Sequence, residues 1–309
     1  MKKFIVIVYI GIASILINAV HWQENLKPVV PAPDMIKNVA EPETLTQGIV
    51  LGETDSIEDL DSRSIRESQT LTKTVPANLI AGIIPHDVYM GDYIAHFFSA
   101  LSKISSPATI ILIGPDHFER GDGIFTTTDT AWKTPYGILE PNRSVIHSLE
   151  EKHVAHIQTS VMQSEHSISA LVPFIKYYFP DTKIVPIIMK AATNQNDITA
   201  LRNALSSLQG TTVLVGAIDF SHYLLPSESD INDIFTQQAI EELNENFFLS
   251  LSGNFNDYVD SPGGVAFVLD WSKSHGATRG NVLYHMNRAD ITGIQNQPST
   301  SYFEAVFYK

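Results

Sequence analysis

Histidine and aspartate occur together at two places where an apolar run of the sequence ends. The pairs are His86-Asp87 after residues 79–84 and Asp116-His117 after residues 109–113. Short apolar runs closed by proline or glycine are typical of strands buried on both faces. Because ligands in open α/β sheets bind beyond the carboxyl ends of parallel strands, we expect both pairs to lie at one edge of a sheet.

Two further segments combine a carboxylate with an imidazole. Glu165-His166 precedes a predicted helix, and Asp219 and His222 follow the apolar run at 212–217. If that strand ends near residue 217 and one helical turn follows, Asp219 and His222 face the same way. The N-terminus of a helix stabilises a carboxylate such as Glu165. It also lowers the pKa of His166, which favours the neutral imidazole that binds a metal or accepts a proton.

The residue types indicate metal chemistry without sulfur. The chain contains eleven histidines and no cysteine, which excludes disulfides, thiolate catalysis and cysteine-ligated zinc. Imidazole and carboxylate ligands suit Fe(II), Zn, Cu(II) or Mn, and two histidines with one carboxylate form the facial triad of non-haem iron sites. Further histidines and carboxylates in the same place can act as general acids and bases or can orient the ligands.

Each candidate also has a purely structural interpretation. A histidine at a strand end can simply form a hydrogen bond, and Asp116 and Asp219 can cap the turns or helices that follow them. None of the segments has a compact metal-binding spacing such as H-E-x-x-H. The recurrence of imidazole and carboxylate at four element ends favours a shared site over four separate structural roles.

The composition is that of a globular protein. The chain has 309 residues, of which 44% are hydrophobic and 17% charged, and this length suits one large domain or two small ones. The formal net charge of −14 argues against a nucleic-acid partner, which selects a basic protein face. The same excess of acidic residues favours solubility and the binding of cations.

From Leu79 onward, apolar runs alternate with amphipathic segments of helical length. The predicted strands are 79–84, 109–113, 183–188, 212–217, 281–286 and 301–308, and the predicted helices are 91–103, 143–152, 167–179, 197–208, 230–246 and a segment ending near 275. Strands that alternate with helices are typical of βαβ units. We therefore predict an α/β fold with a single mixed, mostly parallel sheet flanked by helices.

The N-terminal part of the chain has a different character. Two lysines precede seventeen uncharged residues, Phe4–Val20, a pattern that predicts a signal peptide or membrane anchor at 1–20 and an exported protein. Residues 21–76 are rich in proline and acidic residues, which predicts a linker with little fixed structure before about Thr70. The domain itself is expected at 77–309, with the membrane contacted through the N-terminal segment only.

Short motifs spread over residues 79–308 form an ordered set. They are Pro85-His86 with Tyr89 and Gly91, residues 112–117, residues 132–137, Glu165-His166-Ser167, residues 219–222, Leu283-Tyr284 and Ser301-Tyr302. As a set they resemble the Memo-like family, known in prokaryotes as AmmeMemoRadiSam system protein B. The resemblance implies a fold like that of class III extradiol dioxygenases, with a non-haem iron-type pocket in a mixed α/β sheet.

The resemblance also implies a mononuclear metal site built from His86 and His117, with Asp219 and His222 adjacent. Members of the family usually carry a cysteine, followed by glycine, at the start of a helix. This chain has Asp260 or Ser261 at that place. Asp260 would complete a set of two histidines and one carboxylate, a hard ligand field, whereas the hydroxyl of Ser261 would be a much weaker ligand.

These considerations give one set of expectations for the function. The expected metal ligands are His86, His117, Asp219, His222 and Asp260, and the expected catalytic residues are Glu165, His166 and His222. The expected cofactor is a divalent metal, iron in preference to copper or zinc, in a metal-dependent oxidoreductase of the dioxygenase type. The alternatives are a non-catalytic module that binds a small anion or a peptide in the same pocket, and metal-assisted hydrolysis at a zinc site.

Overall fold

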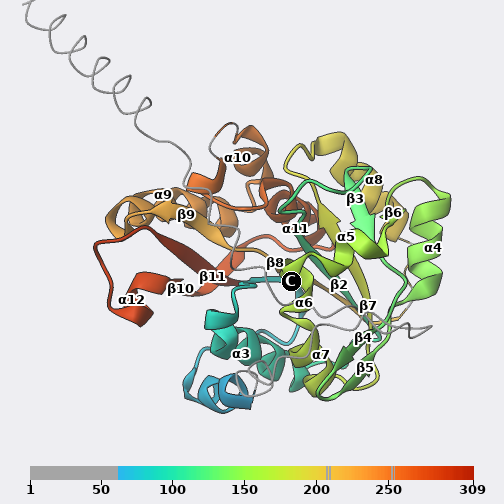
Figure 1. The fold of residues 1–309 in the computed structure, drawn as a ribbon, viewed down its shortest axis with the longest axis horizontal. Helices are drawn as coiled ribbons and strands as arrows, with labels where there is room; N and C mark the ends of the chain where they lie inside the picture. Colours follow the sequence, from blue (N-terminus) through green and yellow to red (C-terminus); the bar gives the residue numbers. More distant parts are fainter. Residues whose placement is uncertain (1–61, 207, 209, 252, 254) are drawn as a thin grey trace, which may run out of the picture. The chain divides into compact units, whose positions relative to one another are not determined.

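Four parallel strands form the centre of the main sheet (Figure 1). Their spatial order is β1 (Leu79–Ile84), β8 (Thr212–Ala217), β2 (Thr109–Pro115) and β7 (Lys183–Met189). Apart from residues at strand starts, these strands are buried along their length. That burial explains why they read as continuous apolar runs without alternation. The computed structural model describes residues 62–309 except 207, 209, 252 and 254, and all of them belong to one compact unit.

Antiparallel strands extend the sheet on both sides. On one side, β11 (Ser299–Tyr308) pairs with β1, with β10 (Gly280–Asn287) and with β9 (Phe220–Leu224). On the other side, β3 (Phe125–Thr127) pairs antiparallel with β7 and parallel with β6 (His156–Ile157). The sheet is therefore mixed, with its parallel strands in the middle.

Helices cover both faces of the sheet and bury two hydrophobic clusters against it. The first cluster involves α4 (Arg143–Glu151), α8 (Gln195–Leu205) and α11 (Pro262–Ser274), and the second involves α3 (Gly91–Ser102) and α7 (Val172–Tyr178). In Figure 1, α8 and α11 lie above the sheet, and α3 and α7 lie below it. Burial of these apolar faces is the main source of stability for such layers.

Shorter elements connect these layers. They are η2 (Ser68–Thr70), η3 (Val88–Met90), β4 (Trp132–Thr134), β5 (Gly137–Leu139), α5 (Thr159–Gln163), α6 (His166–Ser169), α9 (Pro226–Glu241), α10 (Glu245–Ser250), η4 (Phe255–Asp257) and α12 (Arg288–Thr292). Strands β4 and β5 form a separate two-stranded ribbon.

The sequence explains where two of the long helices begin. Asn194 accepts backbone hydrogen bonds at the start of α8, and Asp197 bonds back to the Asn194 backbone, which together form a capping box. The side chain of Ser261 accepts a hydrogen bond from the backbone of Gly264, and Pro262 occupies the first turn of α11. Both helices therefore start at a polar cap that follows a strand or loop.

The predicted α/β fold with a mixed sheet flanked by helices is confirmed, and two strands, 79–84 and 212–217, have the predicted bounds. The helical turn expected after residue 217 is wrong. That segment is strand β9, because Phe220 and His222 pair with β11. The helix predicted at 167–179 is divided into α6 and α7, and the helix predicted at 230–246 is divided into α9 and α10.

The start of the described region also differs from expectation. Residues 62–67 are helical and run into η2, and Ser64 and Ser68 are buried. The prediction of little fixed structure before about Thr70 is therefore wrong for these residues. The apolar segment Phe4–Val20 lies outside the described residues. Among the helices that the structure describes, none combines the length and apolarity needed to cross a bilayer.

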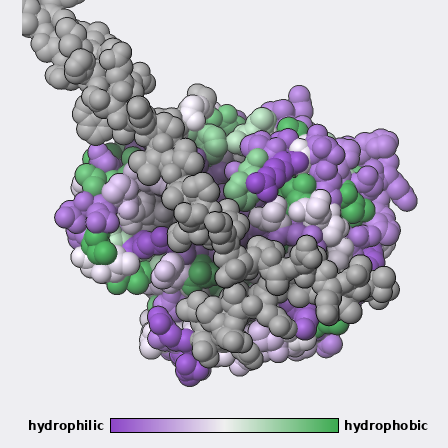
Figure 2. All heavy atoms as spheres, viewed as in Figure 1, coloured by the Kyte–Doolittle hydropathy of each residue, from purple (hydrophilic) through white to green (hydrophobic). Residues whose placement is uncertain are grey.

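Hydrophilic side chains gather at one end of the surface. Figure 2 shows them over the part of the visible face where Figure 1 places α4 and β6. Residues 147, 150, 151, 152 and 153 in this region include charged or imidazole side chains. Two of them, Glu150 and Glu151, are among the carboxylates that give the chain its negative net charge.

Candidate metal centre

Three neighbouring strands deliver polar side chains to the same place beyond their carboxyl ends. His86 follows β1 by two residues, Asp219 follows β8 by two residues, and His117 follows β2 by two residues. Because β8 lies between β1 and β2, Asp219 comes from the strand between the two histidines. The imidazole ring centroids of His86 and His117 are 5.1 Å apart. The two strand ends singled out in the sequence therefore do meet.

A second carboxylate joins them from the segment before α11. Oδ2 of Asp260 lies 3.5 Å from Nε2 of His86 and 3.7 Å from Nε2 of His117. Oδ2 of Asp219 lies 3.6 Å from the same His86 nitrogen. The backbones also interlock, because the Asp219 amide donates to the Asp260 carboxylate and the Asp260 amide donates to the Asp219 carbonyl. Both carboxylates and His86 are buried.

Hydrogen bonds fix the direction of both imidazoles. Nδ1 of His86 lies 3.1 Å from the carbonyl oxygen of Ala217, which can only accept, so this nitrogen donates. Nδ1 of His117 lies 2.7 Å from Oε1 of Glu165. In both rings Nε2 is left to face Asp260. A second hydrogen bond of this kind typically orients a metal-binding histidine.

Glu165 lies behind His117 at the start of α6. Its buried carboxylate accepts hydrogen bonds from the backbone amides of His117, His166 and Ser167, as well as from the His117 ring. Burial acts to raise the pKa of Glu165, but these donors outweigh it and lower the pKa to about 2. The carboxylate is therefore ionised and fully occupied, which is the setting of a residue that orients His117.

His166 lies on the solvent side of the cluster. Its ring stacks on His117 at a centroid distance of 4.4 Å and lies 5.3 Å from the ring of His86. Its side chain is 59% exposed. Partial burial, together with the neighbouring His86 and His117, lowers the pKa of His166 to about 4. The pKa of His166 is thus shifted in the expected direction, with burial as the largest cause.

His222 comes from β9 and lies deeper in the structure. Its Nδ1 is buried and, among the residues that the structure describes, has no hydrogen-bond partner. Burial lowers the pKa of His222, so its ring is neutral. It is not part of either group of closely spaced ligand atoms, which are His86, His117 and His166 in one and His86, Asp219 and Asp260 in the other. The structure thus places His222 close to the carboxylates but outside these groups.

The charges of the cluster favour a cation. Burial, and then the neighbouring Asp260 charge, raise the pKa of Asp219. Burial would also raise the pKa of Asp260, but the nearby His117 and His86 outweigh it and lower the pKa. Oδ1 of Asp260 is buried without a partner in the described part of the chain. Two buried carboxylates with a free oxygen, facing two oriented imidazole nitrogens, fit a divalent metal ion.

Other polar residues of the strand ends have structural partners. Asp87 accepts a hydrogen bond from the hydroxyl of Tyr302 at 2.6 Å and pairs with Arg288. Asp116 accepts from two backbone amides of the loop that follows it. Ser261 is the cap of α11. Of the two candidate residues before α11, Asp260 therefore points to the imidazoles, and Ser261 does not.

The structure places a third imidazole in the cluster. His166, expected as a catalytic residue with a neutral ring that binds a metal or accepts a proton, lies in one group of ligand atoms with His86 and His117. Its stacking on the ring of His117 is the part that the sequence did not indicate. Glu165 orients the ring of His117, and the residue that follows Glu165 in the chain, His166, stacks on the face of that ring.

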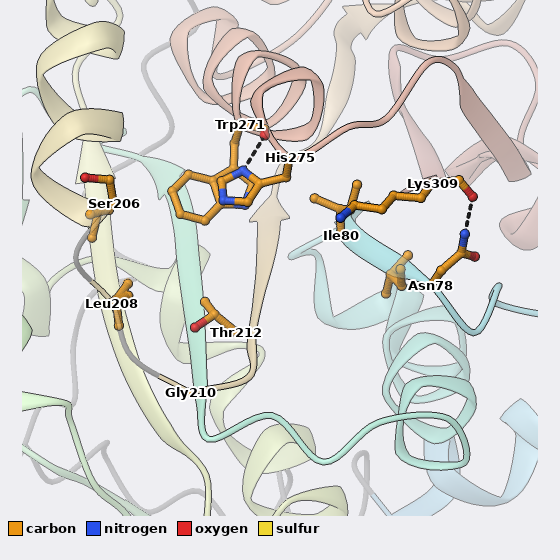
Figure 3. A pocket seen from close by; sticks show the side chains of 11 residues that line it. Asn78, Ile80, Ser206, Leu208, Gly210, Thr212, Trp271, His275 and Lys309 are labelled. Atoms are coloured by element: carbon orange, nitrogen blue, oxygen red, sulfur yellow. Dashed lines mark hydrogen bonds between the residues drawn. The ribbon is translucent and has the colours of Figure 1, made fainter.

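A cavity of about 410 Å³ lies at the opposite ends of the parallel strands (Figure 3). Leu79 and Ile80 at the start of β1 and Thr212 at the start of β8 line it. Figure 3 shows the stacked rings of Trp271 and His275 on one wall. Among the described residues that line it, none has a carboxylate side chain, which distinguishes this cavity from the histidine cluster.

Comparison with known proteins agrees with the family that the motifs indicate. The family model described as Memo-like protein matches residues 59–306. A MEMO1 family protein of Methanosarcina barkeri is 31% identical over 228 residues, which cover 71% of this chain and 83% of that protein. A MEMO1 family protein of Pyrobaculum aerophilum is 27% identical over 237 residues, covering 74% of this chain and 84% of that protein.

Among solved structures, an uncharacterized protein of Escherichia coli K12 is similar to 73% of this chain and 99% of its own, with a TM-score of 0.47 and 11% sequence identity. The family match begins at residue 59, within the segment expected to be a linker, and ends three residues before the last residue of the chain. It includes every residue of the histidine and carboxylate cluster. The chain therefore belongs to the Memo-like protein family.

Proposed function

We propose that the chain holds one divalent metal ion between His86, His117 and Asp260 and acts as a metal-dependent oxidoreductase of the dioxygenase type. The observation that carries this proposal is the position of the Asp260 carboxylate, 3.5 and 3.7 Å from the two imidazole nitrogens. Ligand atoms about 2.1 Å from a metal in tetrahedral directions are roughly 3.4 Å apart. The Asp260 oxygen is therefore at a suitable distance from each imidazole nitrogen to share an ion with it.

The ligand types favour iron over copper or zinc. Two imidazoles and one carboxylate, with further positions open, are the donor set of non-haem Fe(II) sites. Replacement of the family cysteine by Asp260 removes the soft ligand that would favour copper. When bound, iron supplies open coordination positions and one-electron redox chemistry.

The remaining residues of the cluster have separate roles in this proposal. Glu165 and the carbonyl of Ala217 hold the two ligand rings in place. His166 is neutral and lies on the solvent side, where it can accept a proton from a substrate hydroxyl. Asp219 lies next to His86 and provides either a fourth ligand atom or a second orienting carboxylate. His222 keeps a neutral ring in the buried part of the cluster.

The alternative, a module that binds an anion in the same cluster without metal, is disfavoured by charge. Glu165 and Asp260 are held ionised, because the pKa of each is lowered. Against burial, the hydrogen bonds with Asp260 and Glu165 raise the pKa of His117 to about 10, so this ring carries one positive charge. The sum is negative, and an additional anion among these groups would be repelled.

Metal analysis of protein purified without a histidine tag tests the proposal. We expect about one equivalent of metal per wild-type chain and its loss in the double variant His86→Ala/His117→Ala. The matched control is His147→Ala/His153→Ala, which removes two histidines that lie away from the cluster and is expected to retain the metal. Unchanged iron, copper and zinc content in the first variant would show that the assignment is wrong.

A chelator separates the two candidate functions. A module that binds its ligand without metal is stabilised by that ligand even in EDTA, since stabilisation requires only binding to the native state. We expect instead that EDTA itself lowers the thermal stability of the protein and that added Fe(II) restores it. Oxygen consumption by the iron-loaded protein with catechol-type compounds then tests the reaction class.

A further inference from the structure

An aromatic side chain and an arginine lie beside the solvent side of the metal cluster. Phe118 directly follows His117 and is 51% exposed. The guanidinium carbon of Arg120 lies 4.5 Å from the centre of the Phe118 ring. Arg120 also reaches Ser164, the residue before Glu165, at 3.5 Å. This pair therefore lies between the two segments that supply the outer imidazoles.

The loop that presents this pair is held by its own hydrogen bonds. The Asp116 carboxylate accepts from the amides of Arg120 at 3.1 Å and Gly121 at 2.8 Å. The Glu119 carboxylate accepts from the amide of Ala191 at 2.8 Å. Glu119 has φ +53°, a left-handed conformation that non-glycine residues adopt where surrounding structure imposes it. Phe118 and Arg120 are thus displayed from a fixed loop.

The charge of Arg120 is not neutralised by the protein. No ion pair joins its guanidinium to a carboxylate within the described residues. Arg288 is a direct comparison, since it also lies over an aromatic ring, that of Tyr89, but is paired with Asp87. In a chain of net charge −14, a free guanidinium next to the metal cluster supplies local attraction for an anion.

The surface beside this charge is made of flat rings. The ring centroids of Phe118 and His117 are 6.5 Å apart, and the ring of His166 stacks on that of His117 at a centroid distance of 4.4 Å. Aromatic ligands pack well on such rings in offset or edge-to-face arrangements. A guanidinium presents a planar fork of donors that binds a carboxylate through two hydrogen bonds.

We propose that Phe118 and Arg120 recognise a small aromatic carboxylate, with the carboxylate on Arg120 and the ring against Phe118 and the outer imidazoles. This proposal names the substrate class of the proposed metal site. That the bound carboxylate is a substrate rests on the proposed function. Binding itself requires Arg120 and Phe118 but no metal ion. The two proposals can therefore fail separately.

Calorimetric titration of full-length protein loaded with Zn²⁺, which cannot turn over by redox chemistry, tests the assignment. The probes are benzoate, benzamide, acetate and phenyl phosphate. We expect benzoate to bind more tightly than the other three. We expect its Kd to rise at least fivefold in Arg120→Gln and in Phe118→Ala, and to recover in part in Arg120→Lys. The control Arg143→Gln removes one exposed charge from α4 and leaves the Kd unchanged.

The outcomes decide the proposal clearly. Absence of benzoate binding, or an equal Kd in wild type and Arg120→Gln, overturns it. Tighter binding of phenyl phosphate overturns the carboxylate assignment. Thermal unfolding of each variant shows whether the fold is intact. If Arg120→Gln is unstable, the Kd of Arg120→Lys for benzoate is compared with that of the wild type instead. Repeating the benzoate titration in EDTA separates this proposal from the metal site: a Kd that still depends on Arg120 in EDTA supports the recognition of benzoate whether or not the metal assignment holds.

Discussion

Nδ1 of His117 lies 2.7 Å from Oε1 of Glu165, and the backbone amide of the same histidine donates to the other carboxylate oxygen. One carboxylate thus fixes both the ring and the main chain of His117. Because the carboxylate is buried and the ring is 22% exposed, the interaction is screened little by solvent. It leaves Nε2 directed at Asp260, 3.7 Å away.

Replacement of Glu165 by glutamine is expected to weaken metal binding without removing any metal ligand. Glutamine keeps one acceptor oxygen. Its NH₂ group, however, takes the place of the second carboxylate oxygen and cannot accept the hydrogen bonds that this oxygen accepts in the wild type. Loss of such an orienting partner typically lowers metal affinity by roughly 10- to 100-fold. Competition with a chromogenic chelator measures the change. The matched control is Glu140→Gln on the surface, and equal affinities of the two variants would contradict the orienting role.

The pH dependence of the metal-free protein follows from the same pair. Although burial opposes it, hydrogen bonds to Asp260 and Glu165 raise the pKa of His117 from 6.5 to about 10. This stabilisation is fully present below pH 6.5 and is lost as the pH rises toward 10. The pKa of Glu165 is lowered from 4.5 to about 2, so its contribution is present above pH 4.5 and is lost as the pH falls toward 2.

We therefore expect the stability advantage of metal-free wild type over Glu165→Gln to be greatest between about pH 4.5 and 6.5. Breaking a buried pair of this kind costs on the order of 3 kcal/mol. Urea unfolding in EDTA across pH 3–10 measures the difference in unfolding free energy. A difference that stays constant over the whole range would show that the pair is not ionised as inferred.

The sequence was most informative where strand ends carry the chemistry. His86 and His117 could be predicted to meet because their apolar runs are unambiguous strands, and parallel strands end at one edge. Asp260 could be proposed only from the resemblance, since no local pattern distinguishes it from a helix-capping aspartate. The stacking of His166 on His117 depends on the position of a four-residue helix, which no periodicity specifies.

Strand β9 shows why local pattern was insufficient there. Asp219 and His222 lie three residues apart after a buried strand, and this spacing was interpreted as one helical turn. The segment is instead held as a strand by distant partners. Asp233 on α9 accepts from the hydroxyls of Ser221 at 2.7 Å and Ser301 at 3.0 Å, and its other oxygen lies 2.7 Å from Nε2 of His285. Such contacts over long sequence distances are invisible to periodicity.

These contacts predict a large effect of Asp233→Ala. The substitution leaves the buried Ser301 hydroxyl without its acceptor and removes the partner of the His285 ring, whereas Ser221 keeps the Asp257 carbonyl as an acceptor. An unsatisfied buried group costs about 1–3 kcal/mol, so we expect a loss of roughly that size in unfolding free energy and a loosened β9, seen as faster amide hydrogen exchange at His222. The control Asp230→Ala, on the exposed side of the same helix, is expected to change stability little. Similar stabilities of the two variants would argue against the network.

Restoring the family cysteine at Asp260 tests why this chain carries a carboxylate. Asp260→Cys replaces a hard oxygen ligand with a thiolate at the point where Asp260 faces His86 and His117. Thiolate favours soft metals, so we expect the variant to retain one metal per chain and to shift its preference from iron toward copper or zinc. The Co²⁺-loaded variant is expected to gain a thiolate-to-metal charge-transfer absorption that the wild type lacks. Ser261→Cys is the matched control, because Ser261 caps α11 and does not face the imidazoles. If Ser261→Cys rather than Asp260→Cys shows that absorption, the third ligand position lies at residue 261 and the assignment of Asp260 is wrong.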